Sequence, residues 1–584
     1  MREYFYCVIS NPLRGILAGA ICILAMLPAG AVQAQIAQNA LEEVRAESSK
    51  LLQTSFMEAL EGGKVDDLQL HHKSALQTFY QTRQNQSYWM SESTIYSRAE
   101  RMYKAIDEAW THGLNPHNYH YIEIYRLMGE QNNPQSRIKL ELLLTDAFIR
   151  YARDLSGMRV DGGPMNLDNE NWKLQIEAIE AMQYLSGSSG DFEAVLSAVE
   201  PQGQTYKALR RELIRLVNEG ESEKESLLPI EFEGVLRPGW GHPTIAKIRQ
   251  YFEMPTLERN NTTYDDNLAA AVIRFQKDNN LEPDGVIGPS TLEAMNRTNF
   301  RKINQIIANL ERLRWVNTDR GDKFVIVNIP SATLWAIENG KVAFEMPVIV
   351  GTPVRATLSF NTVINGVRLN PDWTVPPTIK KFDILPKVKE DPAYFADKGM
   401  ELIRGYGSDA TTLDPHAIDW DNLSTRELHA IRMVQTPGDH NPLGRYRVLM
   451  PNRHNIYLHD TNHPELFDKN ERALSSGCIR MKYPLQMTEF LLEDAEGTWD
   501  DERIKGVLDT YRKTDIDLQR SIPVSILYYT AWLDGNGRVV YGNDIYNKDA
   551  KLLELLSNID GTFIPVHNKR YASDLSDAQV ALNR

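Results

Sequence analysis

The sequence predicts an α+β fold in several domains: a helical scaffold, a small three-helix domain, and a mostly β domain that carries an inserted lid. The chain has 584 residues, too many for one hydrophobic core, because single cores stop growing near about 250 to 300 residues. Apolar residues recur at helical spacing in the first part of the chain, whereas they alternate with polar residues after Lys323. This change of period predicts a change of domain type.

Composition and charge limit the partners. The chain is 42% hydrophobic and 24% charged, as is typical of a soluble globular protein. Its formal net charge of -14 opposes binding to phosphate backbones, which attract lysine and arginine. We therefore expect no nucleic-acid partner.

Residues 1–34 have the pattern of a secretory signal peptide. Arg2 and Arg14 supply positive charge, residues 15–27 form an apolar run, and residues 32–34 offer a small-residue cleavage site. The apolar run is short for a membrane span, which needs about 20 residues. We expect the signal to be cleaved, and membrane association only if it is not.

Cys478 is the one cysteine outside this signal, since Cys7 and Cys22 lie within it. The exported chain could form no internal disulfide. An unpaired thiol in an oxidising compartment is prone to oxidation, which makes a reactive role worth testing. A buried, inert structural cysteine is the alternative.

We expect a helical scaffold domain over residues 35–230. Helix-type spacing is clear at residues 146–153, and turn-forming residues at 112–116 and 161–164 mark breaks between helices. The aromatic pair at residues 88–89 is expected in the core.

A compact unit of three short helical segments is expected over residues 241–297. In its clearest segment, residues 267–276, the apolar side chains fall on one helical face. Asp265 or Asp266 can cap this helix at its start. Residues 282–289 then supply two tight turns before the last helical segment.

This unit resembles the three-helix peptidoglycan-binding domain family. The family pattern is matched by Tyr264-Asp265, by the run 271–276 (Ala-Val-Ile-Arg-Phe-Gln) and by the run 284–291, which begins Asp-Gly and ends in threonine. The resemblance implies glycan binding. Most of the matched positions are core and turn residues, which report the fold in the first place.

Alternating runs at residues 324–330, 333–337 and 342–351 predict β-strands. Asn339-Gly340, between the second and third runs, is a strong hairpin signal. A mostly β domain is thus expected from this part of the chain onward.

We place the β domain at residues 321–547 and a connecting helix at residues 298–320. Residues 376–432 are rich in Pro, Asp and Tyr and lack sustained alternation, so we expect an insertion that acts as a lid over the sheet. Residues 548–584 are expected to form a C-terminal tail.

Chemistry-bearing residues gather near the end of the predicted sheet. In the strand that ends at His459, alternation would send Ile456 and Leu458 into the core, while Tyr457 and His459 share the other face. This predicts that His459 is presented rather than buried. The segment containing Cys478 follows after a turn-rich stretch.

A thiol attacks carbonyls as thiolate, so Cys478 needs a proton acceptor nearby, and His459 can take the proton and later return it. Gly477 lets the backbone approach a substrate, and the amides of Gly477 and Cys478 could form an oxyanion hole. Arg480 could bind a carboxylate or phosphate, or could form a structural ion pair.

The segment from His459 to Cys478 resembles the catalytic signature of the L,D-transpeptidase family, and the resemblance extends over residues 321–485. The family motif reads Ser-His-Gly-Cys-x-Arg, and the chain matches it except that Ser476 replaces the second histidine. His459 is thus the only histidine of the motif. The domain order looks like the large Gram-negative branch, which implies a periplasmic location.

The resemblance implies a cysteine acyltransferase that needs no cofactor or metal. Cys478 would attack the third residue of a peptidoglycan stem, usually diaminopimelate, and expel the terminal D-alanine. The amine of a second stem would then attack the thioester and form a cross-link. The backbone carbonyl of Asp460 would orient His459. Implied partners are stem peptides and glycan, with other cell-wall synthesis proteins as further potential partners.

Side chains around the thiol are candidates for substrate contacts. Ser475, Ser476 and Arg480 flank Cys478 in sequence. Tyr457 and Trp373 could lie beside the reacting carbonyl, or could have ordinary packing roles.

Four other functions compete with this one. An L,D-carboxypeptidase or a cysteine endopeptidase would use the same thioester, although endopeptidases usually place cysteine before histidine, the reverse of the order here. A zinc enzyme could use the histidines at positions 440, 454, 459 and 463, but the His-Glu-x-x-His arrangement is missing. A non-catalytic scaffold would bind the wall through residues 241–297.

Overall fold

The computed structural model describes residues 54–561, except residues 55, 66, 91–94, 131, 168–171, 188–190, 221–225, 256–260, 280 and 318. The predicted signal peptide and the end of the predicted tail lie outside the described residues. The chain divides into two compact units. The first comprises the described parts of Met1–Gly157, Leu174–Pro201 and Asp560–Arg584, and the second comprises those of Met158–Lys173 and Gln202–Ile559.

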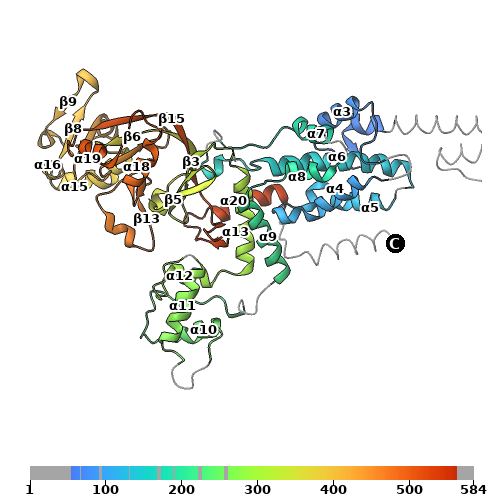
Figure 1. Cartoon of the computed structure of the whole chain (residues 1–584), viewed down its shortest axis with the longest axis horizontal. Helices are drawn as coiled ribbons and strands as arrows, with labels where there is room; N and C mark the ends of the chain where they lie inside the picture. The colour runs from blue at the N-terminus through green and yellow to red at the C-terminus, as the bar shows by residue number, and fades with distance from the viewer. Residues whose placement is uncertain are drawn as a thin grey trace, which may run out of the picture. The chain divides into compact units, whose positions relative to one another are not determined.

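The first unit is helical, as predicted (Figure 1). Its helices are α3 (Lys73–Thr82), α4 (Ser97–Asp107), α5 (Tyr121–Met128), α6 (Pro134–Ser156), α7 (Ala178–Gly187) and α8 (Phe192–Val199). Helix α6 is buried along most of its length, and the other helices pack around it. Trp89 is fully buried in this core, which confirms its predicted packing role.

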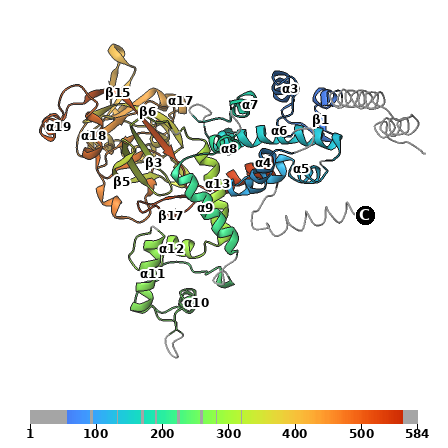
Figure 2. The ribbon, with the colours of Figure 1, turned by 45° about the vertical axis from the view of Figure 1, so that its right-hand side comes forward.

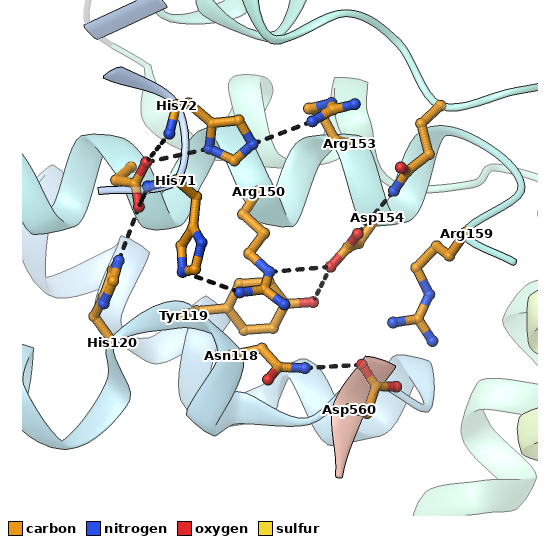
Figure 3. A network of polar contacts seen from close by, with 12 residues as sticks. His71, His72, Asn118, Tyr119, His120, Arg150, Arg153, Asp154, Arg159 and Asp560 are labelled. Atoms are coloured by element: carbon orange, nitrogen blue, oxygen red, sulfur yellow. Dashed lines mark hydrogen bonds and ion pairs between the residues drawn. The ribbon is translucent and has the colours of Figure 1, made fainter. Parts of the chain in front are cut away.

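Asp146 of α6 joins two distant segments to this core, those that carry the histidines His71, His72 and His120 labelled in Figure 3. Its carboxylate accepts the backbone N–H groups of His71 and His72, the Nδ1 of His72 at 3.1 Å and the Nε2 of His120 at 2.8 Å. Burial alone would raise the pKa of Asp146, but the bonds from His120 and His72 outweigh it and hold that pKa below its usual range. The carboxylate is therefore ionised and fully engaged.

The second unit begins with helices that the sequence assigned to the scaffold domain of residues 35–230. Helix α9 (Gln204–Glu219) packs along α13 (Asn299–Arg314), the predicted connecting helix, and the two lie side by side in Figures 1 and 2. Glu311 of α13 is fully buried and forms an ion pair with Arg159. Residues 158–173 and α9 thus fold with the second unit, because their polar and apolar partners lie on α13.

The three-helix unit contains α10 (Thr244–Tyr251), α11 (Asp266–Asp278) and α12 (Pro289–Met295). Asp265 caps α11 by accepting the N–H of Leu268. Gln276, a residue of the family pattern, is buried and its amide binds the turn at residues 284–286. This position of the family pattern therefore stabilises the fold by holding the turn.

The mostly β domain is a nine-stranded sheet that closes into a barrel (Figure 2). The strand order is β13-β5-β14-β12-β11-β6-β15-β3-β4, and β4 also pairs with β5, which closes the barrel. The strands are β3 (Lys323–Asn328), β4 (Thr333–Glu338), β5 (Lys341–Gly351), β6 (Phe360–Leu369), β11 (Tyr446–Leu449), β12 (Leu458–His459), β13 (Ala473–Ser475), β14 (Ile479–Met481) and β15 (Thr514–Leu527). The predicted hairpin is confirmed, since Asn339 and Gly340 both have positive φ, 50° and 73°.

The predicted lid is a small subdomain with its own core. Its sheet has the order β7-β10-β8-β9, formed by β7 (Trp373–Thr374), β8 (Met400–Arg404), β9 (Thr411–Leu413) and β10 (Ile431–Gln435). Short helices α14 (Pro377–Ile379), α15 (Leu385–Glu390), α16 (Tyr394–Asp397) and α17 (Thr425–Ala430) cover it. Because β7 pairs with β10, the subdomain begins before residue 376 and ends after residue 432.

The predicted tail of residues 548–584 begins with an ordered helix, α20 (Lys548–Asp560). Leu552 and Leu556 are buried, and Asp549 forms an ion pair with Arg312 of α13. The start of the tail therefore packs onto the second unit, because α20 carries apolar residues at helical spacing that the prediction overlooked.

Within the described ranges, no helix combines the length and the apolar character that crossing a membrane requires.

The helical first unit, the three-helix unit and the barrel together confirm the predicted α+β architecture.

Candidate active site

Strand pairing places His459 between two arginines. Arg447 on β11 lies directly opposite His459 on β12, and His459 lies opposite Arg480 on β14. Directly paired residues share one face of a sheet. Val448, Leu458 and Ile479, which alternate with them, are buried in the barrel core. The polar side chains thus form a row on the opposite face.

His459 is held by its own backbone. Its Nδ1 lies 2.5 Å from the carbonyl oxygen of Asp460, so Nδ1 carries the proton and donates, and Nε2 keeps its lone pair. The Asp460 carboxylate accepts the N–H groups of Arg445 and Thr461. A Cβ on Gly444 would lie 2.3 Å from that carboxyl group, so only glycine fits there. The carbonyl that orients His459 is itself held in place.

The prediction that His459 is presented was wrong, because its exposed fraction is only 4%. Alternation along a strand indicates which face a side chain is on, but not what lies beside it. Here Arg447 and Arg480 flank the imidazole on the same face. Burial, with the charge of Arg480 next, lowers the pKa of His459 to about 3. The imidazole is neutral at neutral pH.

Cys478 is half-buried immediately before β14. His459 pairs with Arg480 of β14, and Cys478 precedes Arg480 by two residues, at the start of that neighbouring strand. Its Sγ lies 3.6 Å from the carbonyl oxygen of Asn455. Burial raises the pKa of the Cys478 thiol, against the charges of Arg447 and Arg480. The resting pair is thus a neutral thiol and a neutral imidazole.

Ser475 shapes the loop that carries the thiol. Its Oγ donates to the carbonyl oxygen of Cys478 at 2.6 Å and accepts the N–H of Gly477 at 3.1 Å. Gly477 has φ of +113°, which favours glycine, and its carbonyl accepts the hydroxyl of Thr357 at 2.8 Å. The amide of Gly477, which we predicted to contribute to an oxyanion hole, therefore donates to Ser475. The oxyanion-hole role stays a prediction for the amide of Cys478.

Ser476 connects the thiol loop to the lid. The exposed Ser476 hydroxyl accepts a hydrogen bond from Arg355 at 3.1 Å. Arg355 also forms a two-bond ion pair with Asp383 of the lid, at 2.5 and 2.9 Å. Sequence analysis missed Arg355 and Asp383, because no local pattern signals a contact between residues this far apart in the chain.

The two predicted aromatic contacts have different surroundings. Tyr457 lies under the guanidinium of Arg447, whose Cζ is 3.8 Å from the ring centroid. Trp373, on β7, packs against the hydrophobic core of the lid. Trp373 thus contributes to lid packing, whereas Tyr457 lies in the row next to His459.

One described cluster has ligand atoms close enough for a metal ion. His71, His120 and Asp146 have such atoms within 4.8 Å of one another. However, the Asp146 oxygens already accept four hydrogen bonds, and Arg150 lies 3.2 Å from the Nε2 of His71 (Figure 3). A guanidinium at this distance repels a divalent cation. We assign the cluster a structural role.

Comparison with known proteins identifies the domain that contains the thiol and the imidazole. Residues 322–505 match the family described as "L,D-transpeptidase catalytic domain". The chain carries an L,D-transpeptidase catalytic domain. The match includes both His459 and Cys478, and the catalytic-domain family predicted from the motif is confirmed. Residues 74–213 match "Scaffold domain" and residues 248–295 match "Putative peptidoglycan binding domain".

Relatives of the chain include a curated protein of Haemophilus influenzae named "Putative L,D-transpeptidase". It is 35% identical over 248 residues, a match that covers 42% of this chain and 48% of that protein. The chain thus spans about half the length of the curated relative it matches.

Two solved L,D-transpeptidases, from Xylanimonas cellulosilytica and Stackebrandtia nassauensis, are 14% and 13% identical. The first match covers 51% of this chain and 99% of the solved one, and the second covers 50% and 94%. The TM-scores of these two matches are 0.15 and 0.17.

Proposed function

We propose that the chain is a peptidoglycan L,D-transpeptidase that joins the diaminopimelate residues of two stem peptides through a thioester on Cys478. One observation carries this proposal: Cys478 immediately precedes β14, and His459 lies on β12, the strand that pairs with β14, within the matched catalytic domain. His459 also has its Nδ1 engaged by Asp460, so that Nε2 is the nitrogen that can accept a proton.

In the first step, Sγ of Cys478 attacks the carbonyl carbon of the third stem residue while the thiol proton moves to Nε2 of His459. The carbon–nitrogen bond to the terminal D-alanine then breaks, and His459 returns the proton to the leaving amine. Because both groups are neutral at rest, proton transfer accompanies the attack and no thiolate–imidazolium pair stands ready beforehand.

In the second step, the side-chain amine of a second stem attacks the thioester carbonyl. The carbon–sulfur bond breaks, and the amine proton passes through His459 to the sulfur. The product is an amide cross-link between two third residues, and the enzyme is regenerated. Water in place of the amine would give L,D-carboxypeptidase activity, so product analysis separates the two outcomes.

We propose that residues 241–297 bind glycan strands and that the chain works in the periplasm. The matched peptidoglycan-binding family supports the first proposal, and cell-wall enzymes of this kind work outside the cytoplasm.

Mass spectrometry after incubation with a tetrapeptide muropeptide tests the function. We expect wild-type protein to gain the mass of a tripeptide acyl group on Cys478, to release D-alanine and to yield cross-linked dimers. Cys478→Ala should form no adduct and should keep its binding to isolated cell walls. Unchanged cross-linking by Cys478→Ala would refute the proposal.

A further inference from the structure

Two arginines beside the thiol have buried N–H groups without a partner. The Nε atoms of Arg447 and Arg480 are buried and make no hydrogen bond within the part of the chain that the structure describes. Buried donors are normally paired, because an unpaired one forfeits its bonds to water. Two unpaired donors in the candidate active site indicate that a bound molecule supplies the acceptor.

The neighbouring arginine in the same row shows the contrast. Arg368 on β6 lies directly opposite Arg447, but its guanidinium forms two bonds to the carboxylate of Asp515, at 2.6 and 2.7 Å. Three arginines thus share one row, and the one farthest from the thiol has its own carboxylate. Among the described residues, no carboxylate forms such an ion pair with Arg447 or Arg480, the two arginines next to His459.

The two guanidiniums bracket the reacting atoms. They lie on either side of His459 on the same face of the sheet, and both interact electrostatically with Cys478. The ring of Tyr457 supports Arg447 from below at 3.8 Å. Burial lowers the pKa of both arginines, as expected for cations whose loss of water outweighs the attraction of nearby acidic groups.

We propose that Arg447 and Arg480 form a binding site for the terminal carboxylate of the stem peptide, on the residue that leaves. The inference rests on the proposed function. In that reaction the carboxylate belongs to the residue whose nitrogen departs, so it lies next to the scissile bond and next to the two arginines. Arginine is suited to this role because its planar N–H donors match the two carboxylate oxygens.

Binding of the carboxylate would also activate the base. The positive charges of Arg447 and Arg480 oppose formation of an imidazolium at His459. A carboxylate held between them would cancel much of that repulsion, so His459 would accept a proton more readily once a stem with a free terminus is bound. The site would therefore distinguish stems that end directly after the scissile bond's leaving residue from longer stems. It would raise kcat as well as the affinity.

The test compares three tetrapeptides: one with both free carboxylates, one with the terminal carboxylate converted to an amide, and one with the diaminopimelate carboxylate converted to an amide. The rate of thioester formation on Cys478 is measured for wild-type protein and for Arg447→Gln, Arg480→Gln and Arg447→Lys. For wild type we expect terminal amidation to lower kcat/KM by about ten- to a hundredfold, the usual effect of losing a hydrogen bond to a charged group, through both kcat and KM.

In Arg447→Gln and Arg480→Gln, kcat/KM for the free peptide should fall by a similar factor, while kcat/KM for the terminal amide should change little. The preference for the free terminus should therefore disappear. Arg447→Lys should keep part of it. Continued turnover of the amide shows that each variant is folded. Arg368→Gln is the matched control, and it should keep the full wild-type preference because Asp515 already occupies Arg368.

Equal wild-type rates on the free and terminally amidated peptides would overturn the proposal, and so would variants that lose both rates equally. A wild-type preference that follows the diaminopimelate carboxylate would assign the site to that group and overturn the present assignment. If no peptide forms a thioester on wild-type protein, the proposed function itself fails.

Discussion

Replacement of Ser475 by alanine should damage the thiol loop far more than replacement of its neighbour Ser476. The Ser475 hydroxyl joins the carbonyl of Cys478 to the amide of Gly477, and Ser475 is buried. Its loss leaves two backbone groups unsatisfied, each costing about 1 to 3 kcal/mol if water does not reach it. Ser476 is exposed and makes one bond to Arg355, so its loss should cost less than about 1 kcal/mol.

A loss of about 2 kcal/mol from the active loop corresponds to about a thirtyfold smaller population of the correct geometry. We therefore expect Ser475→Ala to form the Cys478 thioester about thirtyfold more slowly or worse, and Ser476→Ala to stay within a few-fold of wild type. The assay is the time course of the adduct mass under single-turnover conditions, with circular dichroism as a check of folding. Equal rates for the two variants, or a fully active Ser475→Ala, would refute the reasoning.

Three further predictions concern the lid, pH and the helical unit. Asp383→Asn removes the ion pair with Arg355, which is partly exposed, so steady-state kinetics should show a KM raised a few-fold with little change in kcat. Acylation of Cys478 should change little from about pH 5 through neutrality and should show no step near pH 6.5, because the neutral thiol, whose pKa is raised, and the neutral imidazole, whose pKa is lowered to about 3, are the reactive forms over this range; a rate profile from about pH 5 to 10 measures this. Asp146→Asn should destabilise the helical unit by about 3 kcal/mol or more in urea unfolding, because a neutral amide replaces a buried carboxylate that holds four donors.

The Asp146 prediction also specifies how the stability of the helical unit changes with pH. Its folded pKa is depressed, so its contribution is present above the unfolded value near about 3.9 and is lost as pH falls from there toward the folded value. Wild type should lose stability over that acidic range, and Asp146→Asn should lose less. Parallel curves for the two proteins would contradict this. A raised kcat with unchanged KM would contradict the lid prediction, and a rate plateau beginning near pH 6.5 would contradict the thiol prediction.

Much of the fold follows from local signals. The Asn339-Gly340 turn forms because both residues adopt positive φ at small cost, and α11 begins at Asp265 because its carboxylate caps a free N–H group. The strands of the mostly β domain and the three-helix unit follow from the hydrophobic period, whereas closure into a barrel is seen only in the pairing of β4 with β5. Unit boundaries follow less well, because α9 and α20 are helices by local pattern whose partners, such as Arg312, lie on a distant helix.

By itself, the sequence determined the chemistry available: one thiol beyond the predicted signal, one histidine in its motif, and a strand that places His459 opposite the core side. Only the tertiary structure decided that His459 is buried between Arg447 and Arg480, that Gly477 donates to Ser475, and that Arg355 joins the thiol loop to Asp383. Turn geometry and alternation depend on a few consecutive residues. Burial, a missing counterion and a shifted pKa depend on strands that come together only when segments far apart in the chain pair in register.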